Sequence, residues 1–254
     1  KHYHRGAIKA LDGVTADINK GDVMVVIGPS GSGKSTFLRC INQLESPSGG
    51  IVEYEGKNLL DKKCDIRKFR EEVGMVFQRF NLFPLKTVAE NVMMAPVLTK
   101  HMNKEEAHEK ALELLDKVGL KDKADVYPST LSGGQQQRTA IARAIVTRPK
   151  LILADEPTGN LDSKNGKEVM GLLSELHREG TTIVMVTHSQ HDAGYADRII
   201  HLFDGHVLGE EEAGLQNLYR RRLSWVYGFR ISSRLFAACA TKDGRPWSPW
   251  SVWR

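Results

Sequence analysis

Short, continuous apolar runs alternate with amphipathic stretches along most of this 254-residue chain. The run Asp22–Gly28 (DVMVVIG) shows no polar alternation and has a glycine on each side, which is typical of a strand buried on both faces of a sheet. Three more runs have strand length, namely Leu151–Ala154, Thr182–Val186 and Arg198–Phe203, and a helical pattern over Lys164–Arg178 separates the first two. Strands that alternate with helices predict an α/β fold with a mostly parallel sheet.

Two segments depart from this alternation. Ile51–Glu55, followed by Gly56, has the pattern of a surface hairpin. Residues from about Phe80 to Val146 are mainly helical in pattern and predict an inserted helical subdomain. Within it, Asn103 is a suitable cap for a helix that ends at Gly119 and has an apolar stripe made of Ala107, Ala111, Leu112, Leu114, Leu115 and Val118.

Apolar runs and cysteines exclude some classes of protein. No run approaches the roughly 18–20 residues that a helix needs to cross a bilayer. Cys40, Cys64 and Cys239 lie far apart and lack the spacing of metal ligands. We therefore expect reduced thiols in a cytosolic protein, without a disulfide framework.

The net charge of +5 is concentrated at the C-terminal end. Residues 214–254 contain eight Lys and Arg with one acidic residue, Asp243, and all four tryptophans. The rest of the chain is close to neutral, so we expect no nucleic-acid partner. Two interpretations of residues 214–254 remain open: a basic amphipathic segment that lies on anionic lipid, or an extension that is without fixed structure or is a misread sequence, whose deletion leaves activity intact.

The first candidate for chemistry follows the run at Asp22–Gly28. The segment from Gly28 to Ser35 (GPSGSGKS) matches the phosphate-loop pattern G-x-x-x-x-G-K-[ST] in the required place, directly after a buried strand. Its backbone N–H groups would face phosphates at the start of the next helix, the lysine would add a positive charge, and the serine hydroxyl would bind Mg²⁺. The predicted nucleotide ligands here are Gly28, Ser30, Gly31, Gly33, Lys34, Ser35 and Thr36.

A pair of carboxylates ends another apolar run. Asp155 and Glu156 follow Leu151–Ala154, at the strand end where open α/β sheets bind ligands. We expect Asp155 to hold Mg²⁺, directly or through water, and Glu156 to polarise the attacking water. Phosphate loops and acidic strands occur together in many nucleotidases, so these two motifs leave the family open.

The segment Leu131–Arg138 (LSGGQQQR) distinguishes among the families that share a phosphate loop and an acidic strand end. It resembles the signature sequence of ABC ATPases, and its distance from the other motifs suits that family. Ser132 can cap the helix that follows, and the glycines allow a phosphate to approach the exposed N–H groups. The predicted contacts with nucleotide in this segment are Ser132, Gly134 and Gln135.

This resemblance implies roles for four further positions. Gln78 resembles the Q-loop glutamine that touches Mg²⁺ and the attacking water. Asp162, in Asn160–Asp162, resembles the D-loop residue that crosses to the opposite subunit. His188 resembles the switch histidine that contacts the γ-phosphate, and Tyr3 resembles the aromatic residue that stacks on adenine.

The resemblance covers roughly residues 1–208 and implies the fold of a P-loop NTPase. That fold has a mostly parallel RecA-like sheet, an N-terminal antiparallel β subdomain and an inserted helical subdomain at about 80–146; residues 209–254 form a separate extension. It also implies ATP and Mg²⁺ at the interface of a head-to-tail dimer, formed by two copies or with a related subunit. Separate permease subunits then place the protein at the cytoplasmic face of the membrane, as a peripheral subunit.

The two halves of the chain resemble different branches of the family. Arg39–Leu44, Gly74–Asn91 and Glu90–Met94 resemble polar-amino-acid uptake ATPases, whereas Ala154–Lys164 and Val186–Asp192 resemble the lipoprotein-release and macrolide or peptide export branch. Uptake ATPases usually have Ser-Ala where this chain has Gly-Asn at positions 159 and 160. Because residues 80–91 are expected to meet the permease, we predict the ATPase of an amino-acid importer. The alternatives are an export ATPase and a soluble ABC protein without a transport role.

Overall fold

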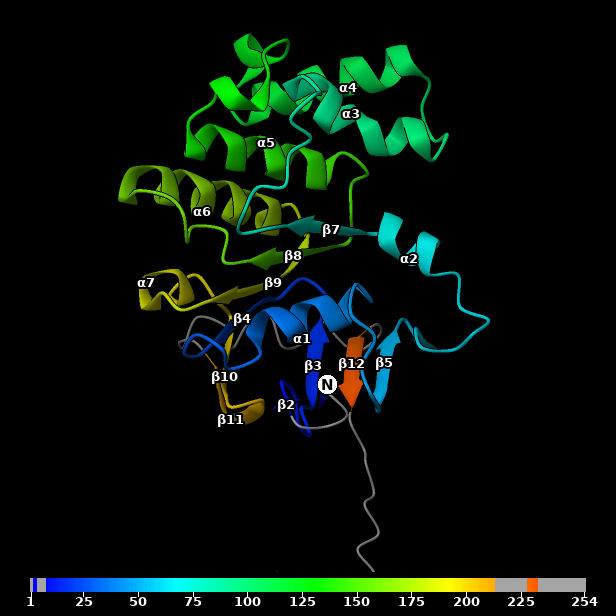
Figure 1. Ribbon diagram of the computed structural model, residues 1–254, viewed down its shortest axis with the longest axis vertical. Coiled ribbons are helices and arrows are strands. Elements are labelled where there is room, and N and C mark those ends of the chain that lie inside the picture. Colours follow the sequence, from blue (N-terminus) through cyan, green and yellow to red (C-terminus); the bar gives the residue numbers. More distant parts are fainter. Residues whose placement is uncertain (1, 4–7, 213–227, 233–254) are drawn as a thin grey trace, which may run out of the picture.

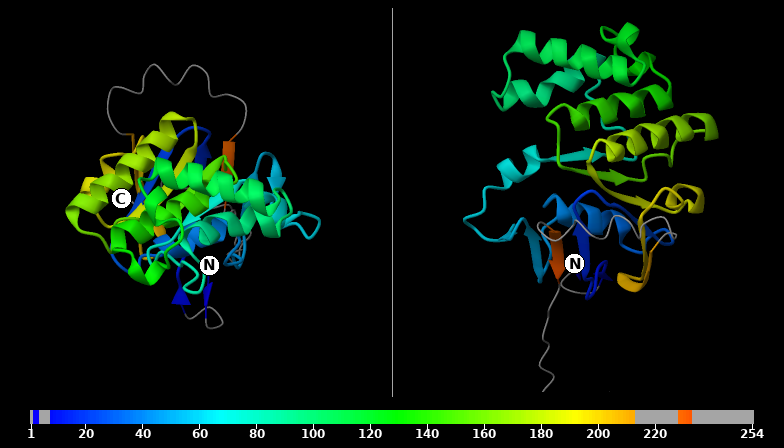
Figure 2. Two further views of the ribbon diagram at one scale, coloured as in Figure 1. Left: turned by 90° about the horizontal axis from the view of Figure 1, so that it is seen from above. Right: turned by 180° about the vertical axis from the view of Figure 1, so that it is seen from behind.

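The computed structural model describes residues 2–3, 8–212 and 228–232 and has a layered α/β architecture. In Figure 1, the helices α3, α4 and α5 form one end, a twisted sheet crosses the middle, and a small antiparallel sheet lies at the other end beyond α1. The view from behind in Figure 2 shows the same sequence of layers. A two-stranded pair, β1 (His2–Tyr3) and β2 (Ile8–Lys9), stands apart from both larger sheets.

The central sheet has six strands in the order β11-β10-β4-β9-β8-β7. All neighbours pair in parallel except β10 and β11, which are antiparallel. The strands are β4 (Val23–Ile27), β7 (Val73–Val76), β8 (Leu151–Asp155), β9 (Thr182–Thr187), β10 (Arg198–Phe203) and β11 (His206–Glu212). Every residue of β4, β8 and β9 is buried. For β4 this confirms the burial on both faces that its unbroken apolar run predicts.

Each face of this sheet belongs to a different hydrophobic core. On β4, Val23, Val25 and Ile27 join one core, whereas Met24 and Val26 join the other, because successive side chains of a strand point to opposite faces. The first core includes residues of α3, α4, α5 and α6 (Ser163–Arg178). The second includes residues of α1 (Lys34–Ile41) and of the antiparallel sheet. The central sheet is therefore covered on both sides.

The predicted helical subdomain is formed by α3 (Val88–Leu98), α4 (Lys104–Lys117) and α5 (Gly133–Ile145), with the short 3-10 helices η2 (Lys121–Lys123) and η3 (Pro128–Thr130) between the last two. Asn103 caps α4 through a reciprocal capping box with Glu106, as its sequence predicts. The stripe of α4 is buried except at Leu112, which packs against the edge of the core. Two short helices lie outside this subdomain, α2 (Ile66–Glu71) and α7 (Gln190–Ala193).

The antiparallel sheet contains a strand from the C-terminal extension. Its order is β3-β12-β5-β6, with β3 (Ala16–Asn19), β5 (Ile51–Tyr54), β6 (Lys57–Asn58) and β12 (Gly228–Ser232). The backbone of β12 pairs on one side with β3 and on the other with β5. The interpretation of residues 214–254 as an extension without fixed structure is therefore wrong for residues 228–232. Residues 213–227 and 233–254, which include the tryptophans, lie outside the described residues.

The described sheets and helices otherwise have the predicted organisation of a P-loop NTPase fold. Strand β11 runs from His206 to Glu212 and so crosses the boundary predicted after residue 208. No helix among the described residues is long and apolar enough to cross a membrane.

Candidate functional site

The carboxyl ends of neighbouring parallel strands meet at one edge of the central sheet. Gly28 follows β4, Gln78 comes after β7, Glu156 follows β8 and His188 follows β9. Because these strands are parallel neighbours in the sheet, four segments that are distant in sequence converge there. Three of them are in contact through the side chain of Glu156.

The phosphate loop has two glycines that no larger residue could replace without movement. A Cβ at Gly28 would lie 2.0 Å from the carbonyl oxygen of Leu202, and one at Gly33 would lie 2.1 Å from that of Ala10. Gly33 also has a φ of +100°, which disfavours any residue with a side chain. Ser30 and Gly31 are exposed, whereas Thr36 is half-buried.

Lys34 begins α1 and is almost completely buried, with 5% of its surface exposed. Its Nζ donates hydrogen bonds to the carbonyl oxygens of Gly28 at 2.8 Å and Pro29 at 2.9 Å. The ammonium group thus lies inside the curve of the loop, at the positive end of α1, whose first turn contains no acidic residue. A lysine and a helix N-terminus at one place make a binding site for phosphate.

The second residue of α1 contacts the end of β8. Ser35 Oγ donates a hydrogen bond to Asp155 Oδ1 at 2.6 Å, and the Arg39 guanidinium lies 3.5 Å from Asp155 Oδ2. Asp155 is buried, with 3% exposed. A hydroxyl beside a carboxylate is a ligand pair that suits Mg²⁺, which prefers oxygen ligands and keeps several waters. The residues present therefore fit this cation.

The side chain of Glu156 joins its own segment to those of Gln78 and His188. Gln78 Nε2 donates to Glu156 Oε2 at 3.0 Å, and His188 Nδ1 lies 3.3 Å from the same oxygen. The backbone of Glu156 is left-handed, with a φ of +44°, and its N–H donates to the carbonyl oxygen of Val186 on β9. This strained conformation turns the carboxylate away from the line of β8 and toward Gln78 and His188.

The loop after Glu156 fits closely around this cluster. A Cβ at Gly159 would lie 3.2 Å from Glu156 Oε2 and 3.3 Å from Gln78 Nε2. Asn160 Nδ2 donates to the backbone carbonyl oxygen of Gln78 at 2.9 Å. The Gly-Asn pair that distinguishes this chain from the uptake pattern thus contacts both Gln78 and Glu156.

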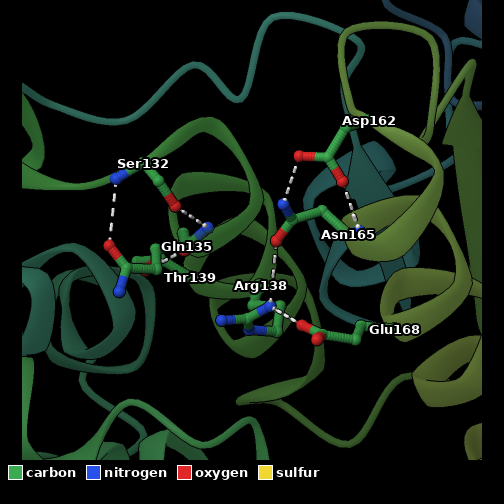
Figure 3. A network of polar contacts seen from close by, with 7 residues as sticks. All are labelled: Ser132, Gln135, Arg138, Thr139, Asp162, Asn165 and Glu168. Carbon is green, nitrogen blue, oxygen red and sulfur yellow. Dashed lines mark hydrogen bonds and ion pairs between the residues drawn. The ribbon is translucent and has the colours of Figure 1, made fainter.

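The signature segment begins α5. Ser132 caps this helix: Gln135 N donates to Ser132 Oγ at 3.3 Å, and Ser132 N donates to Gln135 Oε1 at 2.9 Å (Figure 3). Gly134 is buried, and a Cβ there would lie 1.9 Å from Asn165 Oδ1. The helix start is therefore fixed by a capping box and by the close approach of α6.

Asp162 lies on the neighbouring helix start. It caps α6 by accepting the N–H of Asn165 at 2.8 Å, and its other oxygen accepts the Asn165 side-chain amide at 2.7 Å (Figure 3). The backbone hydrogen bond from Asn165 and then the side-chain one lower the pKa of the Asp162 carboxyl. Arg138 of α5 pairs with Glu168 of α6, which ties the two helices together.

The predicted site residues form two groups. Within the part of the chain that the structure describes, no hydrogen bond or ion pair joins the signature segment to the phosphate loop. The phosphate loop, Asp155, Glu156, Gln78 and His188 form one group, and Ser132, Gly134, Gln135 and Asp162 form the other. Tyr3 lies in β1, and its side chain is outside the described residues.

Sequence reasoning missed two residues at this site. Arg39 contacts Asp155, and the buried side chain of Gln137 donates to the carbonyl oxygens of Pro157 at 2.7 Å and Phe77 at 3.4 Å. Gln137 stands inside the signature string, but its partners are backbone atoms, which leave no mark on the sequence. No motif in the sequence indicated a role for Arg39 at the site.

A phosphate loop, an acidic strand end and a capped signature helix on this sheet define a cassette-type P-loop ATPase. A family model described as "ABC transporter" matches residues 11–159, which is more than half of the chain. The chain belongs to the ABC transporter ATP-binding family, and it binds and hydrolyses ATP as that family does.

Individual relatives and solved structures agree. The glutamine transport ATP-binding protein GlnQ of Bacillus subtilis is 49% identical over 83% of this chain and 86% of its own length. The protein of the same name from Escherichia coli is 50% identical over 77% of this chain and 80% of its own. A dimeric structure of the ATP-binding cassette MJ0796 in a post-hydrolysis state, bound to ADP and Pi, has a TM-score of 0.77 at 44% identity, covering 84% of this chain and 96% of the other.

Proposed function

We propose that this chain is the ATPase subunit of an amino-acid importer, working as a head-to-tail dimer beneath separate permease subunits at the cytoplasmic face of the membrane. The supporting observation is the combination of a cassette site with relatives named for glutamine transport. The arginine transport ATP-binding protein ArtM of Bacillus subtilis is also 48% identical over 80% of this chain.

In this proposal the two groups of site residues meet between subunits. Each phosphate loop, with its lysine and helix N-terminus, holds the phosphates of one ATP, and the capped helix starting at Ser132 in the other subunit faces the same phosphates. The separation of the two groups within one chain supports this arrangement, and so does the dimeric state of the cassette MJ0796. Asp162, at the start of α6 beside the signature helix, faces the same interface.

Each residue around the cluster has a proposed task. Mg²⁺, held by Ser35 and Asp155 with Gln78 nearby, would neutralise phosphate charge during hydrolysis. Glu156 accepts a proton from the attacking water, and His188 donates a hydrogen bond toward the γ-phosphate. Gln78 holds Glu156 until nucleotide and partner subunit are in place. The hydrogen bond from Gln78 and the close approach of His188 at Glu156 Oε2 support these roles.

The permease would dock in a groove next to Gln78. This groove of about 590 Å³ is lined by residues that include Phe77, Asn81, Phe83, Arg143 and Thr147. Phe83 is 49% exposed, and Leu85, in the same segment, is 86% exposed. Exposed apolar side chains beside a groove mark a protein-binding surface. The groove overlaps the segment 80–91 that the sequence assigned to permease contact.

A capture experiment tests the assembly. The tagged chain is incubated with detergent-solubilised membranes of its source cells, and the co-purifying proteins are identified by mass spectrometry. We expect a small multi-span permease, retained by wild type and lost with Leu85→Asp. Leu208→Asp, at a 70% exposed position on β11, is the matched control and should retain it. Capture of a partner with few spans and a large external domain would instead indicate export.

A second measurement tests the composite site without a permease. Glu156→Gln should slow hydrolysis by about 10²–10⁴-fold, the range for loss of a general base, while ATP binding persists. The bound ATP should then hold two copies together in light scattering. A chain that stays monomeric at saturating MgATP in this variant would contradict the shared site.

A further inference from the structure

The loop that carries Gln78 is held by side chains at its backbone carbonyl oxygens. Gln137 of α5 donates to the carbonyl of Phe77 at 3.4 Å, and Asn160 donates to that of Gln78 at 2.9 Å. Arg143, six residues beyond Gln137 on α5, donates to the carbonyls of Phe80 at 2.9 Å and Asn81 at 2.6 Å. Four carbonyls between positions 77 and 81 thus accept hydrogen bonds from only three side chains.

These contacts come from two parts of the proposed ATPase site. Gln137 and Arg143 belong to α5, the helix that begins with the signature segment. Asn160 belongs to the loop that connects Glu156 to the start of α6. The loop at 77–81 has few backbone bonds of its own, and Phe80 and Asn81 are both left-handed, with φ near +50°. Its conformation therefore depends on the side chains that hold it.

Gln137 donates hydrogen bonds to the backbone next to Gln78 and to the backbone next to Glu156. Its Nε2 donates to Pro157 O at 2.7 Å, one residue after Glu156, and to Phe77 O, one residue before Gln78. The side chain is completely buried, and within the described structure its Oε1 has no hydrogen-bond partner. Since both neighbours are carbonyls, the amide must present its N–H groups to them. A single amide thereby fixes the spacing of the two backbones whose side chains meet at Glu156 Oε2.

We propose that Gln137 and Asn160 are positioning residues that hold Gln78 against Glu156 and so transmit the position of the signature helix to the catalytic carboxylate. This inference rests on the ATPase site of the proposed function, and it adds a route by which a partner subunit contacting the start of α5 adjusts hydrolysis. Neither residue touches the reacting atoms. Arg143 anchors the far end of the loop, beside the groove proposed for the permease.

The test separates positioning from packing by the steady-state ATPase rate of the full chain. Gln137→Met keeps the size of the side chain but removes its N–H donors. Asn160→Asp removes the donor at an exposed position and adds a negative charge, which the control Asn58→Asp adds as well. We expect kcat to fall about tenfold or more in each variant, with the KM for ATP within about twofold, because only orientation of the catalytic groups is lost. Gln43→Met and Asn58→Asp are the controls: the amide of Gln43 donates to Cys40 O, and Asn58 lies on β6.

A pH profile adds a readout that simple loss of packing does not produce. Gln137→Glu supplies a donor to Pro157 O only while its carboxyl is protonated, and burial favours that neutral form. The kcat of Gln137→Glu relative to Gln137→Met should therefore rise as the pH falls from 8 to 6. Thermal unfolding and nucleotide binding, followed over the same pH range, should not change in parallel with this ratio.

Several results would overturn the inference. Wild-type kcat in both Gln137→Met and Asn160→Asp would do so, and so would a loss of ATP affinity or thermal stability that accounts for the lower rate. If the buried substitutions do not fold, Asn160→Asp decides alone, because its side chain is exposed. The assay needs no permease, so failed capture of a membrane partner would overturn the proposed transport role and leave this inference standing.

Discussion

Ser35 Oγ donates a 2.6 Å hydrogen bond to Asp155 Oδ1 and so joins the helix after the phosphate loop to the end of β8, across 120 positions of sequence. The Arg39 guanidinium lies 3.5 Å from the other carboxylate oxygen, Asp155 Oδ2, and 3.5 Å from Glu45 Oε1. The hydroxyl on one oxygen and the guanidinium on the other fix the direction of this buried carboxylate. This arrangement prepares the pair for a divalent cation.

Asp155→Asn should therefore weaken the dependence of nucleotide affinity on Mg²⁺. The amide keeps the shape of the side chain but lacks the negative charge that the cation requires, so ATP should bind with nearly the same affinity with and without Mg²⁺. Fluorescent-nucleotide titrations with MgCl₂ and with EDTA measure this difference directly. Glu45→Gln, which removes the other carboxylate beside Arg39, should keep the wild-type response; an unchanged response in Asp155→Asn would contradict the assignment of this ligand.

The start of α5 gives a prediction about packing. A Cβ on Gly134 would lie within 1.9–2.8 Å of three side-chain atoms of Asn165, including its Cβ, whereas a Cβ on Gly133 would find ordinary contacts at 3.6 Å and beyond. Gly134→Ala should lower the free energy of unfolding by about 1–3 kcal/mol, the usual range for overpacking. Gly133→Ala should not lower it, because a Cβ fits at that position. The gain in helix propensity is the same in both variants, so the comparison isolates the effect of packing.

Urea unfolding followed by circular dichroism compares these variants. Adding Asn165→Ala to Gly134→Ala should recover part of the loss, since two of the three crowded atoms are removed. Equal stability of the two alanine variants would show that α5 and α6 separate at little cost.

The sequence predicted those parts of the molecule that depend on local patterns. The apolar run of β4 identified a strand buried on both faces, those of β8 and β9 identified strands, and the capping residues Asn103 and Ser132 marked the starts of α4 and α5. The phosphate loop and the Asp155–Glu156 pair carry recognisable residue types at fixed spacing. These features need no knowledge of the distant contacts that complete the fold.

Contacts to backbone atoms could not be predicted in this way. The partners of Gln137 are carbonyls 20 and 60 positions away, and any residue type can supply a carbonyl. Gly134 was expected to leave room for a phosphate, yet the structure adds a second reason, the side chain of Asn165. The place of β12 between β3 and β5 depends on pairing across about 200 positions of chain, and a run of five residues with mixed polarity does not indicate its partners.

The N-cap of α6 predicts a stability effect at acid pH. The hydrogen bonds from Asn165 lower the pKa of Asp162 in the folded state below its value of about 3.9 in the unfolded chain. The carboxylate therefore stabilises the fold fully above that unfolded value, and the contribution is lost as the pH falls through the folded pKa. The difference in urea midpoint between wild type and Asp162→Ala should be constant from pH 7 to 6 and close below about pH 4.

Asp162→Asn serves as the control for this experiment, because asparagine is an equally good N-cap without a titrating carboxyl. Its advantage over Asp162→Ala should persist at low pH. If the wild-type difference also persists unchanged to pH 3, the hydrogen bonds at Asp162 do not favour the ionised form.

The last prediction concerns the strand from the C-terminal extension. Because β12 pairs with β3 on one side and β5 on the other, a chain that ends at residue 227 would leave both neighbours with unpaired edges. A chain that ends at residue 232 keeps the strand. We expect the chain that ends at residue 232 to unfold at the wild-type temperature. The chain that ends at residue 227 should unfold roughly 5 °C lower or more, since 1 kcal/mol corresponds to about 2–4 °C in a chain of this size. Differential scanning calorimetry without nucleotide makes the comparison. Equal transition temperatures for the two products would mean that β12 adds no stability to the sheet.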